Sequence, residues 1–231
     1  MKIANITIVG LAAIVAVGCG SKSKGTYQAT AAKKVEPAKV TPGNEAELFP
    51  TKEGSQWVYE TEQVTSQGTQ VGEVIFKAVK VIPTGDGNKV QFEMENGGKV
   101  IDRQTWLINS KGIFQLTSGP QQIPFDPPQP VLLFPAEQGR TFSWQGKGVT
   151  SGGQIGTSTI KSTIMGPQEI DTGTGAMSGI AVQQTSEGKV GNQAFKTASM
   201  VWFVPKVGLA RYKQQVAAGT ITLRLKNFTS K

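Results

Sequence analysis

The sequence of 231 residues contains no histidine and a single cysteine, Cys19. Without histidine, neither a Ser-His-Asp triad nor a Cys-His couple can form, and one cysteine cannot make an internal disulfide. The same shortage excludes zinc and haem sites that are built from histidine or from several cysteines. We therefore expect no metal site, no cofactor and no catalytic residue of these common kinds.

Enzyme mechanisms that work without histidine also find little support. Paired carboxylates can hydrolyse glycosides, but the closest pairs are two residues apart on expected strands, where both side chains share one face, most simply the solvated one. These pairs are Glu60 with Glu62 and Glu93 with Glu95. The SxxK pattern from Ser158 to Lys161 falls in an alternating strand and does not open a helix, as Ser-Lys enzymes require. The sequence thus predicts a protein that is not an enzyme.

The N-terminus combines a positive charge with a short apolar segment that ends at the cysteine. Lys2 precedes an apolar stretch over residues 3–17, which closes on the small residues of the tetrapeptide AVGC. This length and ending indicate a signal peptide and not a membrane span. AVGC resembles the lipobox of bacterial lipoproteins, with Ala16 in place of the usual leucine. We therefore predict a signal peptide over residues 1–18 and an acyl anchor, of the palmitate type, on Cys19, with an ordinary secretory signal as the alternative.

The segment that follows the cysteine is poor in large apolar residues. From Gly20 to Glu47 the chain is rich in Ser, Lys, Ala, Thr and Pro, and Tyr27 is its only aromatic residue. Such a composition cannot bury enough apolar surface to offset the entropy of ordering, so residues 19–47 are predicted to form a disordered, flexible tether. Enterobacterial lipoproteins that stay in the inner membrane carry Asp directly after the cysteine. Gly20 therefore favours lipid anchoring at the outer membrane, facing the periplasm of a bacterial cell envelope.

The remaining residues, 48–231, are expected to form one all-β domain. No segment there sustains a helical apolar period, whereas short runs rich in Val, Ile, Thr, Phe and Trp recur between Gly-containing turns. Two of these runs alternate cleanly between apolar and polar residues, as strands with one wet face do. Their apolar positions are Val90, Phe92, Met94 and Ile221, Leu223, Leu225.

Eleven strands are predicted in an antiparallel meander that forms a curled sheet, a half-barrel or a sandwich. Their ranges are 55–66, 70–82, 89–95, 99–109, 112–117, 141–147, 155–165, 178–187, 192–204, 207–216 and 219–229. The run from Val71 to Ile82 is apolar on both faces, which predicts a strand that is covered on both sides or lines a cavity. Ser118–Pro130 holds five prolines, which exclude a central strand, so we expect a semi-rigid lid or crossing loop.

Two aromatic-rich phrases resemble a known group of proteins. LFPTKEGSQWVYE (Leu48 to Glu60) and WFVPKVGLARY (Trp202 to Tyr212) are similar to the opening and closing phrases of uncharacterised bacterial envelope lipoproteins of the TapB-like kind. In the second phrase, Lys206 replaces the usual glycine. The resemblance implies an antiparallel sheet, curled as in lipoprotein carriers of the LolA and LolB type, and it implies no enzymatic activity.

Aromatic residues at alternating spacing are either core or a shelf that binds a hydrophobic ligand. Trp57 and Tyr59 are expected to point to one face of their strand. Together with Phe76 and Trp202 they form the candidate hydrophobic ligand face, with packing in a core as the first interpretation.

The charges do not favour nucleic acid as a partner. The net charge is +8, but the basic residues are scattered, and an exported protein does not meet cytoplasmic nucleic acid. Two classes of function remain. One is a structural, assembly or protein-interaction role in the envelope, and the other is a carrier or binding module for a lipid or other hydrophobic ligand in the periplasm.

Overall fold

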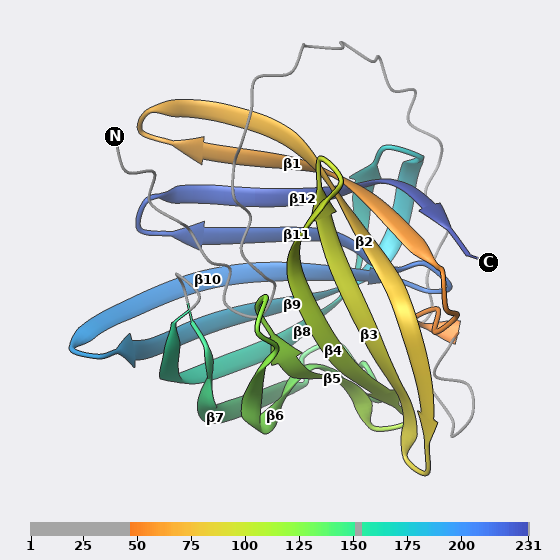
Figure 1. Cartoon of the computed structure of the whole chain (residues 1–231), viewed down its shortest axis with the longest axis horizontal. Helices are drawn as coiled ribbons and strands as arrows, with labels where there is room; N and C mark the ends of the chain where they lie inside the picture. Colours follow the sequence, from red (N-terminus) through yellow and green to blue (C-terminus); the bar gives the residue numbers. More distant parts are fainter. Residues whose placement is uncertain (1–46, 151–153, 231) are drawn as a thin grey trace.

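The computed structural model describes residues 47–150 and 154–230 (Figure 1). The predicted signal peptide, Cys19 and the tether as far as residue 46 lie outside the described residues. The described chain consists of long antiparallel strands joined by tight turns, as the sequence predicts.

Twelve strands form a closed barrel in which each strand pairs with its neighbours in sequence. The strands are β1 (Gln56–Thr65), β2 (Gly68–Thr84), β3 (Gly87–Asn96), β4 (Lys99–Asn109), β5 (Gly112–Ser118), β6 (Ile123–Leu133), β7 (Thr141–Val149), β8 (Ile155–Thr172), β9 (Gly175–Val190), β10 (Gln193–Val204), β11 (Gly208–Val216) and β12 (Gly219–Thr229).

The predicted half-barrel, curled sheet or sandwich is wrong in one respect, since the sheet closes on itself. β1 pairs with β12 over its whole length, from Gln56 opposite Thr229 to Thr65 opposite Gly219. Figure 1 shows these first and last strands side by side. Alternation within a strand is the same in an open and in a closed sheet, so the sequence could not reveal a pairing between the two ends of the domain.

The proline-rich segment is a strand and not a lid or crossing loop. β6 pairs with β5 in a ladder broken by two register shifts, and it pairs with β7 only at Asp126 opposite Lys147. Proline cannot donate to a ladder, and this nearly unpaired side of β6 needs few donors. The prolines are therefore tolerated at a seam, where the barrel is closed by little backbone pairing.

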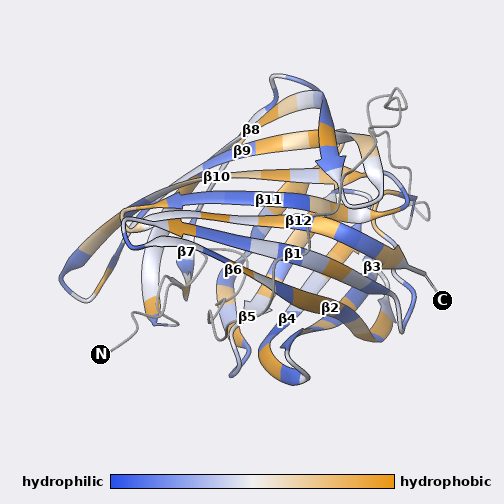
Figure 2. Ribbon diagram, turned by 90° about the horizontal axis from the view of Figure 1, so that it is seen from above, coloured by the Kyte–Doolittle hydropathy of each residue, from blue (hydrophilic) through white to orange (hydrophobic). Residues whose placement is uncertain are grey.

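The inward-facing residues of the strands form the interior of the barrel. Figure 2 shows the alternation of apolar and polar residues along the strands. The two predicted alternating runs are confirmed, because all six of their apolar side chains are buried. The expectation that Val71–Ile82 is covered on both sides is wrong. Its inward residues Val74 and Phe76 are buried, but Val71 is 59% exposed and Val79 is 39% exposed on the outside.

Candidate functional site

Phe49 lies inside the barrel, just before β1 begins. Its ring centroid is 5.4 Å from that of Trp57, 5.4 Å from that of Trp106 and 6.4 Å from that of Phe203. These partners come from β1, β4 and β10, which do not neighbour one another in the sheet, so Phe49 bridges opposite walls of the barrel. Phe76 and Phe92 stack on each other at 4.4 Å and complete the cluster. This region of the interior is packed by its own side chains.

The two aromatic-rich phrases of the sequence meet at this cluster. The indole Nε1–H of Trp57 donates to the backbone oxygen of Val207 at 2.6 Å, and the hydroxyl of Tyr59 donates to that of Leu209 at 2.7 Å. The amide of Lys206 donates to the oxygen of Glu47 at 2.6 Å. Buried Trp and Tyr polar groups require such partners. The phrases are therefore two halves of one structural contact between the start of the domain and the turn from β10 to β11.

This contact explains the glycine of the second phrase, and the same turn holds the lysine in an unusual backbone conformation. Gly208 has φ 86°, and a Cβ there would lie 2.9 Å from the ring of Phe49. Lys206 has φ 64°, the left-handed region that favours glycine.

The structure separates the four residues of the candidate ligand face. Trp57, Tyr59 and Phe76 are fully buried in the interior cluster, and burial raises the pKa of Tyr59 well above its usual value. Trp202 alternates with Phe203 on the outward side of β10 but is only 8% exposed, and its Nε1–H donates to Gln168 at 3.0 Å. Three of the four residues therefore share the interior, and the fourth is covered on the outward side of β10.

A second part of the interior is polar. Gln104 donates to Asp102 at 2.8 Å and accepts hydrogen bonds from Trp106 Nε1 at 2.8 Å and Gln115 Nε2 at 3.2 Å. Burial raises the pKa of Asp102 to about 6, although hydrogen bonds from Gln104 and from the backbone of Arg103 and Gly119 oppose this shift. This buried chain of side chains was not predicted, because Asp and Gln at alternating positions look like a wet face.

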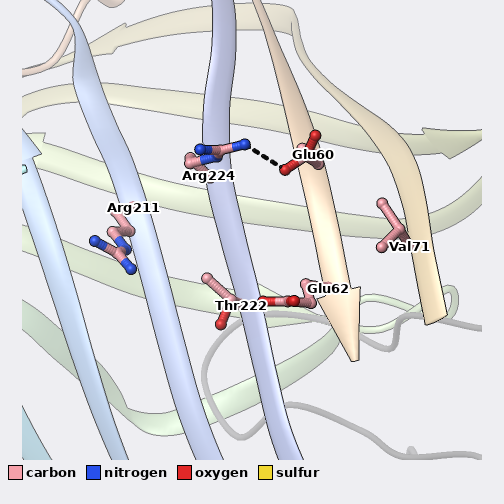
Figure 3. Close-up of a pocket in the computed structure, with 6 residues that line it drawn as sticks. All are labelled: Glu60, Glu62, Val71, Arg211, Thr222 and Arg224. Carbon is pink, nitrogen blue, oxygen red and sulfur yellow. Dashed lines mark hydrogen bonds and ion pairs between the residues drawn. The ribbon is translucent and has the colours of Figure 1, made fainter. Parts of the chain in front are cut away.

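The outside of the barrel carries a groove of about 250 Å³ over β2, β1, β12 and β11 (Figure 3). Figure 3 shows its side chains pointing to the same side of the sheet. The lining residues are Glu60, Glu62, Val71, Arg211, Thr222 and Arg224. Arg224 forms ion pairs with Glu60 at 2.6 Å and with Asp171 at 3.3 Å.

Strand register divides the charges of the groove by sign. One row across the strands runs Glu73, Glu60, Arg224, Arg211, Trp202, and the next runs Val71, Glu62, Thr222, Lys213, Met200. Acidic side chains thus stand on β1 and β2, and basic side chains stand on β11 and β12. The small Thr222 lies between the two sides.

The sequence predicts that some of these residues lie on a solvent-facing side of a strand, but it does not predict that they lie close to one another. The alternation of β12 puts Thr222 and Arg224 opposite its apolar residues. Their meeting with Glu60 and Glu62 depends on the pairing of β1 with β12, which the sequence does not reveal. Within residues 47–150 and 154–230, no three His, Cys, Asp or Glu residues gather in a way that could hold a metal ion. The same residues include no helix long and apolar enough to span a membrane.

Comparison with models of known protein families and with curated proteins finds no match. Solved structures do resemble the chain. One is a candidate lipoprotein from Parabacteroides distasonis, with 12% identity, a TM-score of 0.52, and coverage of 79% of this chain and 98% of that chain. Another is a candidate exported protein of YmcC-like fold from Bacteroides fragilis, with 12% identity, a TM-score of 0.50, and coverage of 80% of this chain and 99% of that chain. At this identity the likeness shows the fold alone.

Proposed function

We propose that the protein is a lipid-anchored lipoprotein of the bacterial cell envelope whose barrel has a non-catalytic structural, assembly or protein-interaction role through its outer surface. Cys19 is the anchor, and residues 19–47 are the tether that lets the barrel reach a partner in the envelope. The outer membrane, facing the periplasm, is the membrane that Gly20 favours.

The observation that carries this proposal is the filling of the apolar interior. A carrier of hydrophobic ligands needs apolar side chains that face a space. Trp57, Phe76 and Phe92 instead contact one another, Trp57 and Phe92 also contact the ring of Phe49, and all four are at most 1% exposed. A lipid could enter this region only by displacing Phe49, which would also break the contact with Gly208.

Two further observations support the proposal. The neighbours of the same fold are described as a candidate lipoprotein and a candidate exported protein, which agrees with the lipobox-like AVGC. Among the described residues, the charged groove offers the outside of the barrel as a surface for contact.

The anchor is tested with the full chain carrying Cys19→Ser. The wild-type protein should fractionate with membranes and resist extraction by salt, whereas the variant, which has no thiol to acylate, should appear in the soluble periplasmic fraction. A variant that stays membrane-bound would contradict anchoring through Cys19.

The same soluble variant tests the role of the barrel by native mass spectrometry. We expect the mass of the bare chain, both as purified and after incubation with phospholipid and free fatty acid. A lipid bound at near one per chain would overturn the proposal and favour the carrier.

The interaction role predicts a specific contact surface. A photo-crosslinking residue at Val71, in the groove, should give one cross-linked product of discrete mass in intact cells. The matched control is position 196, an exposed residue of β10 that does not line the groove, where no such product is expected. Equal products from both positions would indicate random collision.

A further inference from the structure

The groove on the outside of the barrel holds charges that the described residues do not neutralise. Among residues 47–150 and 154–230, neither Arg211 nor Glu62 has an ion-pair partner, although both line the groove. Lys213, which lies beside Thr222 in the register of β11 and β12, has none there either. The groove therefore has a cationic side and an anionic side that are both open to a ligand.

Arg211 is held in place while its hydrogen-bonding capacity is unused. Its guanidinium carbon lies 5.4 Å from the ring centroid of Trp202, a cation–π contact, and the indole of Trp202 is fixed by Gln168. The Nε of Arg211 is buried and has no hydrogen-bond acceptor among the described residues. Guanidinium groups form their strongest hydrogen bonds with carboxylate or phosphate oxygens. The fixed position and the missing acceptor together favour an anionic group at this end.

The opposite side suits a cation. Glu62 is two strands away from Arg211 and two residues further along, so strand geometry puts roughly 12 Å between their backbones. Figure 3 shows the carboxylate of Glu62 directed toward Thr222 and the guanidinium of Arg211 over β11, with the small Thr222 between them. Next to Glu62, the 59% exposed Val71 provides an apolar contact for a short carbon chain.

We propose that the groove binds a compact zwitterion, with its phosphate or carboxylate at Arg211 and Thr222 and its primary ammonium at Glu62. A volume of about 250 Å³ is below the range of drug-sized sites, which begins near ~300 Å³, and it admits a small polar group but no acyl chain. Phosphoethanolamine has this chemistry, either free in solution or as the headgroup of a phospholipid. The inference goes beyond the proposed function, because it concerns a small ligand that binds whether or not a protein partner exists.

The test is a titration of the full-length Cys19→Ser protein with O-phosphoethanolamine at low ionic strength, followed by amide chemical shifts and calorimetry. We expect saturable shifts at Thr222 and Glu62. Inorganic phosphate alone and ethanolamine alone should each bind at least about tenfold more weakly, because each engages one side of the groove. No saturation at millimolar ligand, or phosphate alone binding equally well, would overturn the proposal.

Variants assign the two ends. Glu62→Gln and Thr222→Val should each weaken binding, the first by about tenfold, while the matched control Glu187→Gln, an exposed acid of β9 outside the groove, should leave it unchanged. Arg211→Gln should abolish saturation. If that variant does not fold, the other two still decide. Unchanged affinity in Glu62→Gln would refute an ammonium site.

Vesicles separate the two sources of the ligand. If the source is a membrane, phosphatidylethanolamine vesicles should capture the unlipidated protein in a flotation assay, and soluble phosphoethanolamine should release it. If the source is a free solute, vesicles should fail to capture a protein that still binds soluble phosphoethanolamine. Capture by vesicles that Glu62→Gln does not reduce would contradict the site.

Discussion

The inside of the barrel contains two regions that follow the same strand pattern but are stabilised differently. On β4, the inward residues Trp106 and Ile108 belong to the aromatic region around Phe49, whereas Asp102 and Gln104 belong to the polar region. In the aromatic region most contacts are between apolar surfaces, the polar groups of Trp57 and Tyr59 are bonded to backbone oxygens, and the indole of Trp106 donates to Gln104. In the polar region, burial stabilises the fold only where each polar group finds a partner. The aromatic region should therefore contribute most of the stability, and the polar region should make that stability depend on pH.

The largest expected effect comes from emptying the aromatic region. Phe49→Ala removes a fully buried ring that contacts β1, β3, β4 and β10, so unfolding free energy should fall by about 3–5 kcal/mol. Urea denaturation followed by tryptophan fluorescence measures the change. Phe195→Ala, which truncates a half-buried ring of β10, is the control and should cost clearly less. Equal losses would mean that Phe49 does not join the walls of the barrel.

The next effect lies in the polar region and concerns pH. Burial raises the pKa of Asp102 from 3.8 to about 6, so the folded state holds this proton more tightly than the unfolded state. The contribution of Asp102 to the unfolding free energy is fully present below about pH 4. It falls by about 3 kcal/mol in total as the pH rises toward 6, and it stays level above that. Urea midpoints between pH 4 and 8 measure the change.

The matched variant for this pH dependence is Asp102→Asn. An amide has no proton to lose in this range, so the slope between pH 4 and 6 should flatten. A slope that is unchanged in Asp102→Asn would assign the effect to other carboxylates and would contradict the buried ionisation.

A smaller loss is expected from the centre of the polar region. Gln104→Leu keeps a side chain of similar size but takes a donor from Asp102 and an acceptor from the indole of Trp106. Leaving buried groups unpaired should cost about 2 kcal/mol, and the pKa of Asp102 should rise further because a bond that lowers it is lost. Denaturation at two pH values checks both effects. A loss of unfolding free energy that is the same at pH 4 and pH 8 would mean that Gln104 does not affect the ionisation of Asp102.

The sequence predicted the strands well because alternation is local. Phe92 and Met94, or Leu223 and Leu225, need only their own strand to indicate which face is buried. The sequence singled out the two phrases that form the aromatic contact, which contain Trp57 and Gly208. Their meeting, however, depends on a turn between β10 and β11 that lies far along the chain.

The parts that could not be predicted depend on pairing between distant strands or on burial of polar residues. The closing pair of β1 and β12 creates the groove, and no local pattern encodes it. β6 was missed because prolines argue against a strand. That argument fails only where the neighbouring strand accepts few backbone hydrogen bonds, as β7 does here. Asp102 and Gln104 were missed because hydrophobic patterning assigns such residues to water.

The smallest expected change in stability comes from a buried amide whose oxygen, unlike that of Gln104, has no hydrogen-bond partner among the described residues. Gln129 of β6 is opposite Gln115 in the register and 2% exposed, and its Oε1 has no hydrogen-bond partner among the described residues. Its burial therefore costs desolvation without a compensating bond. Gln129→Leu should be neutral or should stabilise the fold by up to about 1 kcal/mol, in contrast to Gln104→Leu on the neighbouring side of the same region. A loss as large as that of Gln104→Leu, measured under the same conditions, would mean that ordered water satisfies Gln129 and that the polar region is a fully bonded network.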